Sequence, residues 1–218
     1  MGRATGAGDQ LAGTPLPPRT ARGRATRLAL LDAARDVFAT DGFEGAHILD
    51  ITRAAGVASG TFYTYFTTKD ELFREVAFEV IDELTVAPRH TADRGGRGLD
   101  PAADIESAIR AYVEACRRHA RIAASIHQLS HVDPVIRDRR SARFQENATR
   151  GAAYIRRLQA EGRADPAVDA AATADALQTM IVSVVYEHLV LFETGADPEG
   201  LVRTLVGIWV RAIGIPTP

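Results

Sequence analysis

The segment Thr61–Lys69 reads TFYTYFTTK and places hydroxyl groups, aromatic rings and one amine close together. Threonine and tyrosine hydroxyls can donate hydrogen bonds to phosphate oxygens or to base edges. Lys69 is the only lysine among the 26 lysine and arginine residues, and it follows Thr68 at the expected start of a helix. Unpaired backbone N–H groups and the helix dipole attract anions at such a position, so Lys69 is predicted to bind a phosphate there.

Other reactive side chains form weaker patterns. His127 and His131 have the i, i+4 spacing of metal ligands on a helix, but no cysteine or carboxylate cluster completes a site, so neither a metal nor a cofactor is expected. Cys116 is the single cysteine, which excludes an internal disulfide and indicates a small core residue. We find no nucleophile–base pair and no phosphate loop, so the sequence does not predict an enzyme.

Composition is ordinary for a soluble globular protein, with 46% apolar and 25% charged residues and a net charge of −2. Any positive charge that attracts nucleic acid must therefore be local. The N-terminus has no apolar segment typical of a secretion signal. The most apolar run, Met180–Phe192, is shorter than the roughly 20 residues that span a bilayer. We expect a cytoplasmic protein without a membrane segment.

Helical periodicity begins at Thr26, and the first helix is expected to end at Asp41–Gly42, where glycine suits a left-handed cap. Two short helices follow, over His47–Ala55 and from Ser59 onward, with a turn centred on Gly56. This spacing is typical of a helix-turn-helix unit.

A fourth helix is expected from Thr68, because Thr68 and Glu71 form a capping-box pattern. The remaining chain shows helical periodicity throughout, and no stretch alternates with a period of two. The fold class is therefore all-α, with an N-terminal three-helix unit and a C-terminal helical bundle. The later helices are predicted near residues 103–119, 121–131, 134–161, 167–194 and 198–214.

The run Asp50–Phe73, DITRAAGVASGTFYTYFTTKDELF, resembles the DNA-binding segment of the tetracycline-repressor (TetR) family of transcriptional regulators. The resemblance implies a homodimeric repressor whose two helix-turn-helix units enter successive major grooves of a near-palindromic double-stranded DNA operator. It also implies that a small molecule bound in the helical body releases the DNA. One departure from the family pattern is Ala58, which stands where a serine commonly caps the recognition helix.

The helical periodicity of the recognition helix predicts one buried face and one exposed face. Phe62 and Phe66 lie one turn apart and are predicted to anchor it near Phe38 of the first helix. The remaining positions face outward, and Gly60 lets the backbone approach the groove. The predicted DNA-contacting residues are Ser59, Gly60, Thr61, Tyr63, Thr64, Tyr65, Lys69 and, at the start of the second helix, His47.

Polar side chains among apolar neighbours mark a candidate effector site in the helical body. They could be satisfied within the core or at the surface, or they could orient a largely apolar ligand in a pocket. The sequence does not choose between these readings or identify the ligand. The candidates are His127, Gln128, His131, Asn147, Tyr154, Met180 and Tyr186.

The last two helices are apolar around almost their whole circumference, which requires burial on all sides. A four-helix interface between two copies would provide that burial, whereas an internal core pair in a monomer is the alternative. The residues assigned to the interface are Val185, Leu189, Phe192, Leu205 and Trp209.

These observations predict three segments: a disordered arginine-containing arm over 1–24, a DNA-binding domain over 25–71, and an effector-binding and dimerisation domain over 72–218. The arm could be a solvated tail or could lie along DNA. The alternative to a ligand-responsive repressor is a constitutive DNA-binding regulator without an effector.

Overall fold

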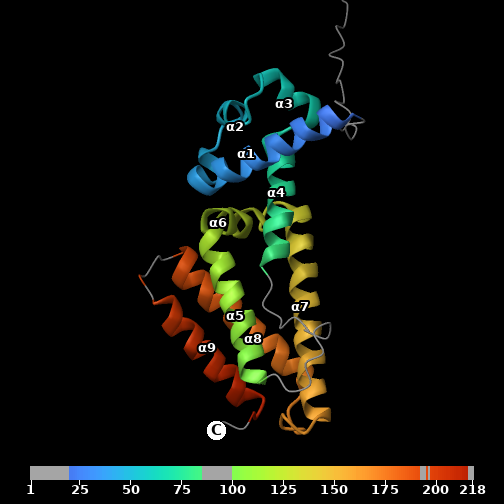
Figure 1. Cartoon of the computed structure of the whole chain (residues 1–218), viewed down its shortest axis with the longest axis vertical. Coiled ribbons are helices and arrows are strands. Elements are labelled where there is room, and N and C mark those ends of the chain that lie inside the picture. Colours follow the sequence, from blue (N-terminus) through green and yellow to red (C-terminus); the bar gives the residue numbers. More distant parts are fainter. Residues whose placement is uncertain (1–19, 85–99, 192–194, 196, 216–218) are drawn as a thin grey trace, which may run out of the picture.

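A computed structural model describes residues 20–84, 100–191, 195 and 197–215, and these residues form helices and their connections (Figure 1). The all-α prediction is confirmed. The helices are α1 Ala21–Gly45, α2 Ile48–Ala54, α3 Ser59–Tyr65, α4 Lys69–Glu83, α5 Pro101–Arg118, α6 Ala120–Leu129, α7 Pro134–Ala160, α8 Ala170–Tyr186 with the π-helical turn η2 Glu187–Leu191, and α9 Pro198–Ala212.

The first helix begins earlier than its apolar periodicity indicates. The Thr20 hydroxyl accepts a hydrogen bond from the Gly23 N–H at 3.0 Å and caps the helix, which starts at Ala21. Residues 21–24 are therefore helical, although the sequence placed them in a disordered arm. The rest of that arm lies outside the described residues, so its contact with DNA stays a prediction.

Four helices of the body, α5, α7, α8 and α9, share one start signal, whereas α6 follows His119 without a side-chain cap. An aspartate carboxylate accepts hydrogen bonds from N–H groups of the first turn, and a proline follows directly in three of the four cases. Because such a cap involves only neighbouring residues, the predicted starts of these helices lie within a few residues of the observed starts. The capping residues are Asp100, Asp133, Asp169 and Asp197, and the prolines are Pro101, Pro134 and Pro198.

One apolar core holds the first four helices together and extends beyond them. Phe62 and Phe66 are fully buried in it, as predicted, and the ring of Phe38 meets that of Phe73 edge-on at 5.0 Å. The same cluster includes Ile122 and other residues of α6 and α7. The helix-turn-helix part is therefore packed directly on the body and not suspended from α4 alone.

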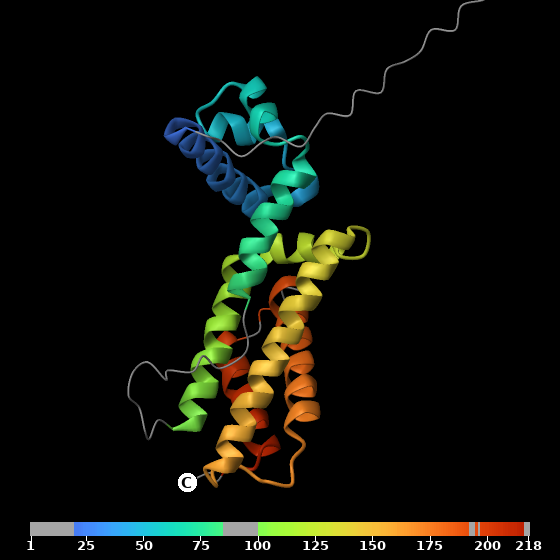
Figure 2. The ribbon, with the colours of Figure 1, turned by 90° about the vertical axis from the view of Figure 1, so that its right-hand side faces the viewer.

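The body is a bundle in which α7 packs along α8 and α5 along α9 (Figures 1 and 2). Figure 2 shows α6 lying across the bundle axis, between the bundle and the N-terminal helices. Buried side chains such as Ile109, Ile155, Ile181 and Trp209 form its core. The position of α6 lets it contact α1 as well as α5, α7 and η2 of the body.

The structure changes the prediction for the two C-terminal helices. Val185, Leu205 and Trp209 are 0%, 2% and 4% exposed within a single chain, because they face α5 and the bundle core. They are not available to a second copy, contrary to the sequence prediction. Leu189 is half-buried and also packs on the chain's own core, and Phe192 lies outside the described residues.

The segment Ala170–Leu191 leaves much of its apolar surface uncovered. It has 22 residues and a mean hydropathy of 1.2, which would suffice to cross a membrane by length and composition alone. The sequence argument considered only the shorter run from Met180 and missed this. Only 28% of its most apolar stretch is buried inside the chain, and Leu191 is 54% exposed.

The C-terminal end of α4 is tied to its neighbours by ionic contacts of Glu83. His119 Nε2 lies 2.8 Å from Glu83 Oε2, and Arg35 of α1 and Arg118 of α5 lie at 3.4 and 3.5 Å from its carboxylate. Burial acts to raise the pKa of Glu83, but the His119 hydrogen bond and the charge of Arg35 outweigh it and lower the pKa below its ordinary value of 4.5. The folded state therefore favours the ionised form.

We expect Glu83→Gln to lower the melting temperature at neutral pH, because it removes this ionised partner. A lowered folded-state pKa contributes stability above the unfolded pKa, and that contribution disappears as pH falls through the folded value. The difference between wild type and variant should therefore shrink below pH 4.5. Thermal unfolding measured across pH checks this, with Glu114→Gln, an exposed i, i+3 partner of Arg117, as the control. Parallel pH profiles of wild type and Glu83→Gln would contradict it.

Candidate nucleic-acid interface and effector pocket

The helix-turn-helix stands at the end of the molecule farthest from the body's C-terminal helices (Figure 1). Its turn depends on Gly56, whose φ of 68° is in the left-handed region that glycine adopts without strain. The Val57 N–H then donates to the Thr52 carbonyl at 3.0 Å and closes the end of α2. Thr52 itself is buried, and its hydroxyl donates to the Leu49 carbonyl at 3.1 Å.

The outward face of α3 agrees with the predicted contact residues. Tyr63 is 61% exposed, Ser59, Gly60 and Thr64 are exposed, and nothing lies within 4 Å of a Cβ added at Gly60. Thr61 and Tyr65 are half-buried, and Tyr65 also packs against the N-terminal core, so it anchors the helix more than the sequence indicated. The contact of all these α3 residues with DNA stays a prediction.

The starts of α2 and α3 are not capped by side chains. Ala58 precedes α3 and offers only its carbonyl, which accepts from the Thr61 N–H at 2.8 Å. His47 precedes α2, is exposed, and makes no capping hydrogen bond. The first N–H groups of both helices are therefore left without the usual hydroxyl or carboxylate acceptor.

Lys69 makes contacts within the chain that the sequence did not predict. Its ammonium donates to the carbonyls of Phe43 at 2.7 Å and Ala46 at 3.0 Å and lies 4.4 Å from the centroid of the Phe43 ring. These carbonyls belong to the end of α1, where unpaired carbonyls and the helix dipole favour a cation. The charge of Lys69 therefore holds α4 against α1, and its contact with a DNA phosphate stays a prediction.

The predicted capping box of α4 is present with one shift. The Glu71 N–H donates to the Thr68 hydroxyl at 3.1 Å, as the pattern requires. The Glu71 carboxylate accepts from the Thr67 N–H at 2.6 Å, one residue before the cap. Both contacts fix the chain direction between α3 and α4, and so the orientation of the recognition helix.

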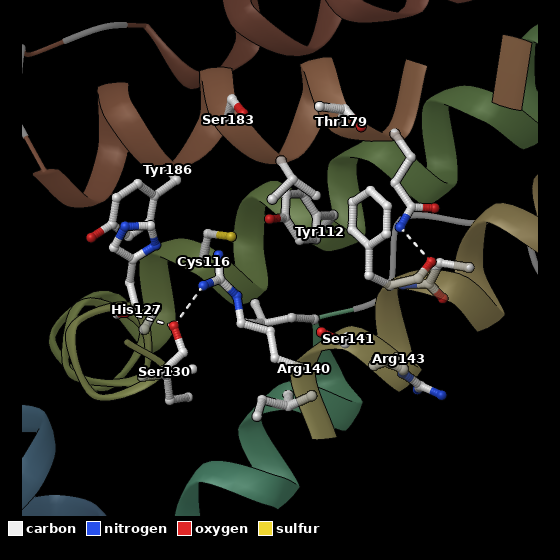
Figure 3. Close-up of a pocket in the computed structure, with 18 of the residues that line it drawn as sticks. Tyr112, Cys116, His127, Ser130, Arg140, Ser141, Arg143, Thr179, Ser183 and Tyr186 are labelled. Carbon is white, nitrogen blue, oxygen red and sulfur yellow. Dashed lines mark hydrogen bonds between the residues drawn. The ribbon is translucent and has the colours of Figure 1, made fainter. Parts of the chain in front are cut away.

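A cavity of about 430 Å³ lies in the body between α4, α5, α6, α7 and α8 (Figure 3). Its volume is within the range of small-molecule sites. Of the candidate effector residues, His127, Asn147 and Tyr186 line it. Gln128 and His131 point to solvent, Met180 packs on the body core, and the buried Tyr154 hydroxyl lies 3.4 Å from the Pro101 carbonyl, away from the cavity.

The sequence prediction missed several lining residues on α7. Arg140 and Phe144 follow the buried Ile136 at spacings of four and precede the predicted Asn147 by seven and three positions, which is one helical face. That spacing was a usable signal in the sequence. Further lining residues include Ile81 and Leu84 of α4, Tyr112 and Cys116 of α5, Ser130, and Gln178, Thr179, Val182 and Ser183 of α8.

The buried titratable groups of the cavity are held neutral. Burial raises the pKa of the Cys116 thiol to about 12 and raises the pKa of Tyr112 well above its ordinary value. Burial lowers the pKa of His127, and the positive charge of Arg140 and the neighbouring His131 lower it further. Each shift favours the neutral form of its group at neutral pH.

The buried polar atoms of the cavity lining that have no hydrogen-bond partner include His127 Nδ1 and Asn147 Oδ1. The His127 ring stacks on Tyr186 at 4.5 Å and meets the His131 ring edge-on at 5.4 Å. In the described part of the chain, no group of three or more histidine, cysteine, aspartate or glutamate residues could hold a metal ion. Unpaired buried polar atoms are rare in proteins, so each of these atoms has room for a further hydrogen-bond partner.

Comparison with known proteins agrees with this arrangement. The family model "Bacterial regulatory proteins, tetR family" matches residues 30–76, and the model "Transcriptional regulator EthR, C-terminal domain" matches residues 105–214. The chain belongs to the TetR family of transcriptional regulators, with an EthR-like C-terminal domain. Members of this family bind DNA operators and are not enzymes.

Two individual relatives match 92% and 55% of this chain. The HTH-type transcriptional regulator EthR of Mycolicibacterium smegmatis is 26% identical over 204 residues, 92% of each chain. The HTH-type transcriptional repressor KstR2 of Rhodococcus jostii is 30% identical over 121 residues, 55% of this chain and 58% of that one.

Solved structures share the fold of this TetR-family chain. A transcriptional regulator from Rhodococcus sp. Rha1 superimposes with a TM-score of 0.65 at 22% identity, covering 88% of this chain and 99% of that one. NalD, the secondary repressor of the MexAB-OprM multidrug efflux pump in Pseudomonas aeruginosa, gives 0.63 at 22% identity, covering 88% and 98%.

Lys69→Met and Tyr63→Phe should separate folding from DNA binding. Lys69→Met removes two charge-assisted hydrogen bonds and should lower the free energy of unfolding by about 1–3 kcal/mol. Tyr63→Phe removes one exposed hydroxyl and should leave the unfolding free energy unchanged, while weakening operator binding by about 1 kcal/mol.

Urea unfolding and fluorescence anisotropy with operator DNA selected in vitro measure the two effects. Unchanged stability of Lys69→Met would contradict its structural role. Unchanged operator affinity of Tyr63→Phe would remove Tyr63 from the contact surface.

Proposed function

We propose that this chain is a ligand-responsive TetR-family repressor that binds a near-palindromic operator as a homodimer. A small molecule in the body cavity would release the DNA. The observation that carries this proposal is the position of the cavity: two of its walls are α4 and α6, and both helices also pack on the DNA-binding part.

The contact through α6 is direct. The Ser125 hydroxyl, only 6% exposed, accepts a hydrogen bond from the Phe43 N–H at 3.2 Å. Ala123, Ile126 and His127 on either side of Ser125 line the cavity. A ligand that moves α6 would therefore move the end of α1.

The contact through α4 reaches the recognition helix. Ile81 and Leu84 at its C-terminal end line the cavity, whereas Lys69 at its first residue binds the Phe43 carbonyl. Between them, Arg74 pairs with Asp133 at 2.8 Å at the start of α7. A rigid helix with a fixed partner near each end can transmit a small rotation to α3, which precedes it.

A homodimer accounts for the uncovered surface of the C-terminal helices. Leu191 and Ile208 are 54% and 38% exposed, and half-buried Val184 and Val206 lie on the same two helices. An apolar helix face of this kind needs a second apolar surface. A two-fold axis through α8 and α9 would also present two helix-turn-helix units to one DNA duplex.

Repression and a cytoplasmic location follow from the same family membership. KstR2 and NalD are both described as repressors. A regulator that acts on operator DNA must be where the DNA is, which in a bacterial cell is the cytoplasm. The alternative, a constitutive regulator without an effector, does not explain the unpaired His127 and Asn147 atoms in a cavity of this size.

Release of operator DNA by a bound molecule tests the effector site. A thermal-shift screen of metabolites should find a ligand, because a ligand at 100 times its Kd adds about 2.7 kcal/mol of stability. We expect that ligand to lower operator affinity by about 1–3 kcal/mol. Ser125→Ala should keep ligand binding but reduce the release, because it removes the hydrogen bond to Phe43.

Thr40→Ala is the matched control, because its hydroxyl bonds only within α1, to the Asp36 carbonyl. A ligand that binds without changing operator affinity would favour the constitutive regulator. Equal release from wild type and Ser125→Ala would exclude α6 as the route of coupling.

Ile208→Asp should convert the dimer to a monomer and weaken operator binding, because it places a carboxylate in the proposed apolar interface. Sedimentation equilibrium gives the molecular mass. Val132→Asp is the control: Val132 is 77% exposed but lies between α6 and α7, away from the C-terminal helices. A dimeric Ile208→Asp variant, or a monomeric wild type, would contradict the interface.

A further inference from the structure

Arg140 carries a charge into the cavity that no carboxylate of the described residues neutralises. Its side chain extends from α7 into the space between His127 and Tyr112, and its Nη1 donates to the Ser130 hydroxyl at 3.0 Å (Figure 3). No aspartate or glutamate in the described part of the chain lies within ion-pair distance of it. The guanidinium therefore has donors directed into the cavity.

The other two arginines of the lining are already engaged. Arg143 pairs with Glu146 at 2.9 Å and donates to the Asp82 carbonyl at 2.6 Å. Arg137 lies 3.8 Å from the carboxylate of Asp138. No acidic side chain lines the cavity among the described residues, so its net charge is positive.

The charge of Arg140 acts within the cavity. After burial itself, it is the largest cause of the lowered pKa of His127, and it opposes the effect of burial on the pKa of Tyr186. A half-buried guanidinium facing aromatic rings is poorly solvated, and a neutral ligand that displaced its water would worsen this cost. An anionic ligand would remove this desolvation cost.

We propose that the effector of this cavity is an amphipathic monocarboxylate whose carboxylate pairs with Arg140. Its apolar body would lie against Ile81, Ile126, Phe144 and Val182, which line the same space. The planar fork of a guanidinium matches a carboxylate through two parallel hydrogen bonds. A phosphate dianion fits less well, because the remaining arginines are committed to acidic partners. This inference rests on the proposed function of the cavity as the effector site.

The test compares acids with their uncharged analogues. Octanoate, decanoate and phenylbutyrate, each beside its primary amide, are titrated into the full-length protein by isothermal calorimetry. The acid should bind wild type at least about tenfold more tightly than its amide, because a charge-assisted pair is worth more than about 1.4 kcal/mol. Arg140→Gln should abolish that preference, and Arg140→Lys should keep its direction.

Arg150→Gln is the matched control, because it removes the same charge from the same helix outside the cavity. Thermal unfolding of each variant verifies the fold, which Arg140 supports only through Ser130. Equal affinity of acid and amide for wild type, or an unchanged preference in Arg140→Gln, would overturn the inference.

Operator release measured in parallel separates this inference from the proposed function. An acid that binds through Arg140 but leaves operator affinity unchanged supports the carboxylate site and contradicts its role as effector site. An uncharged ligand that releases operator equally from wild type and Arg140→Gln supports the repressor and overturns the carboxylate.

Discussion

The junction at Gly42 and Phe43 is the contact on which the arrangement of this protein depends. Gly42 has a φ of 70°, so α1 breaks its regular path there and turns Phe43 toward the body. The Phe43 N–H then binds Ser125 of α6, and its carbonyl and ring bind Lys69 of α4. One residue thereby connects the first helix, the helix after the recognition helix, and the body.

This junction explains why the DNA-binding part and the body share one core. Ile122, Ile126 and Ile136 are buried with the phenylalanines of the helix-turn-helix unit. Ile126 also lines the cavity, so the same side chain belongs to the proposed effector pocket and to the core shared with the DNA-binding part. This shared side chain supports the proposed coupling, because close-packed interiors transmit small displacements.

The cavity combines apolar walls with a few buried polar groups, which is typical of a site that orients an apolar molecule. Its chemistry is set by charge more than by reactivity. Cys116 and His127 are held neutral by burial, whereas Arg140 remains charged without an acidic partner. The specificity of such a site depends on which ligand group satisfies Arg140.

The sequence alone determined the features that depend on neighbouring residues: the helix start at the Thr68 cap, the Gly56 turn, and the inward face of Phe62. Caps and periodicity involve groups within about four positions, so they can be read along the chain. The tertiary structure decided the rest. Lys69 binds carbonyls 23 and 26 positions away, and Trp209 is buried in the core of its own chain. Arg140 has the same side chain as the other arginines of α7 and differs from them in the residues that surround it. These roles depend on packing between distant segments, which local pattern does not specify.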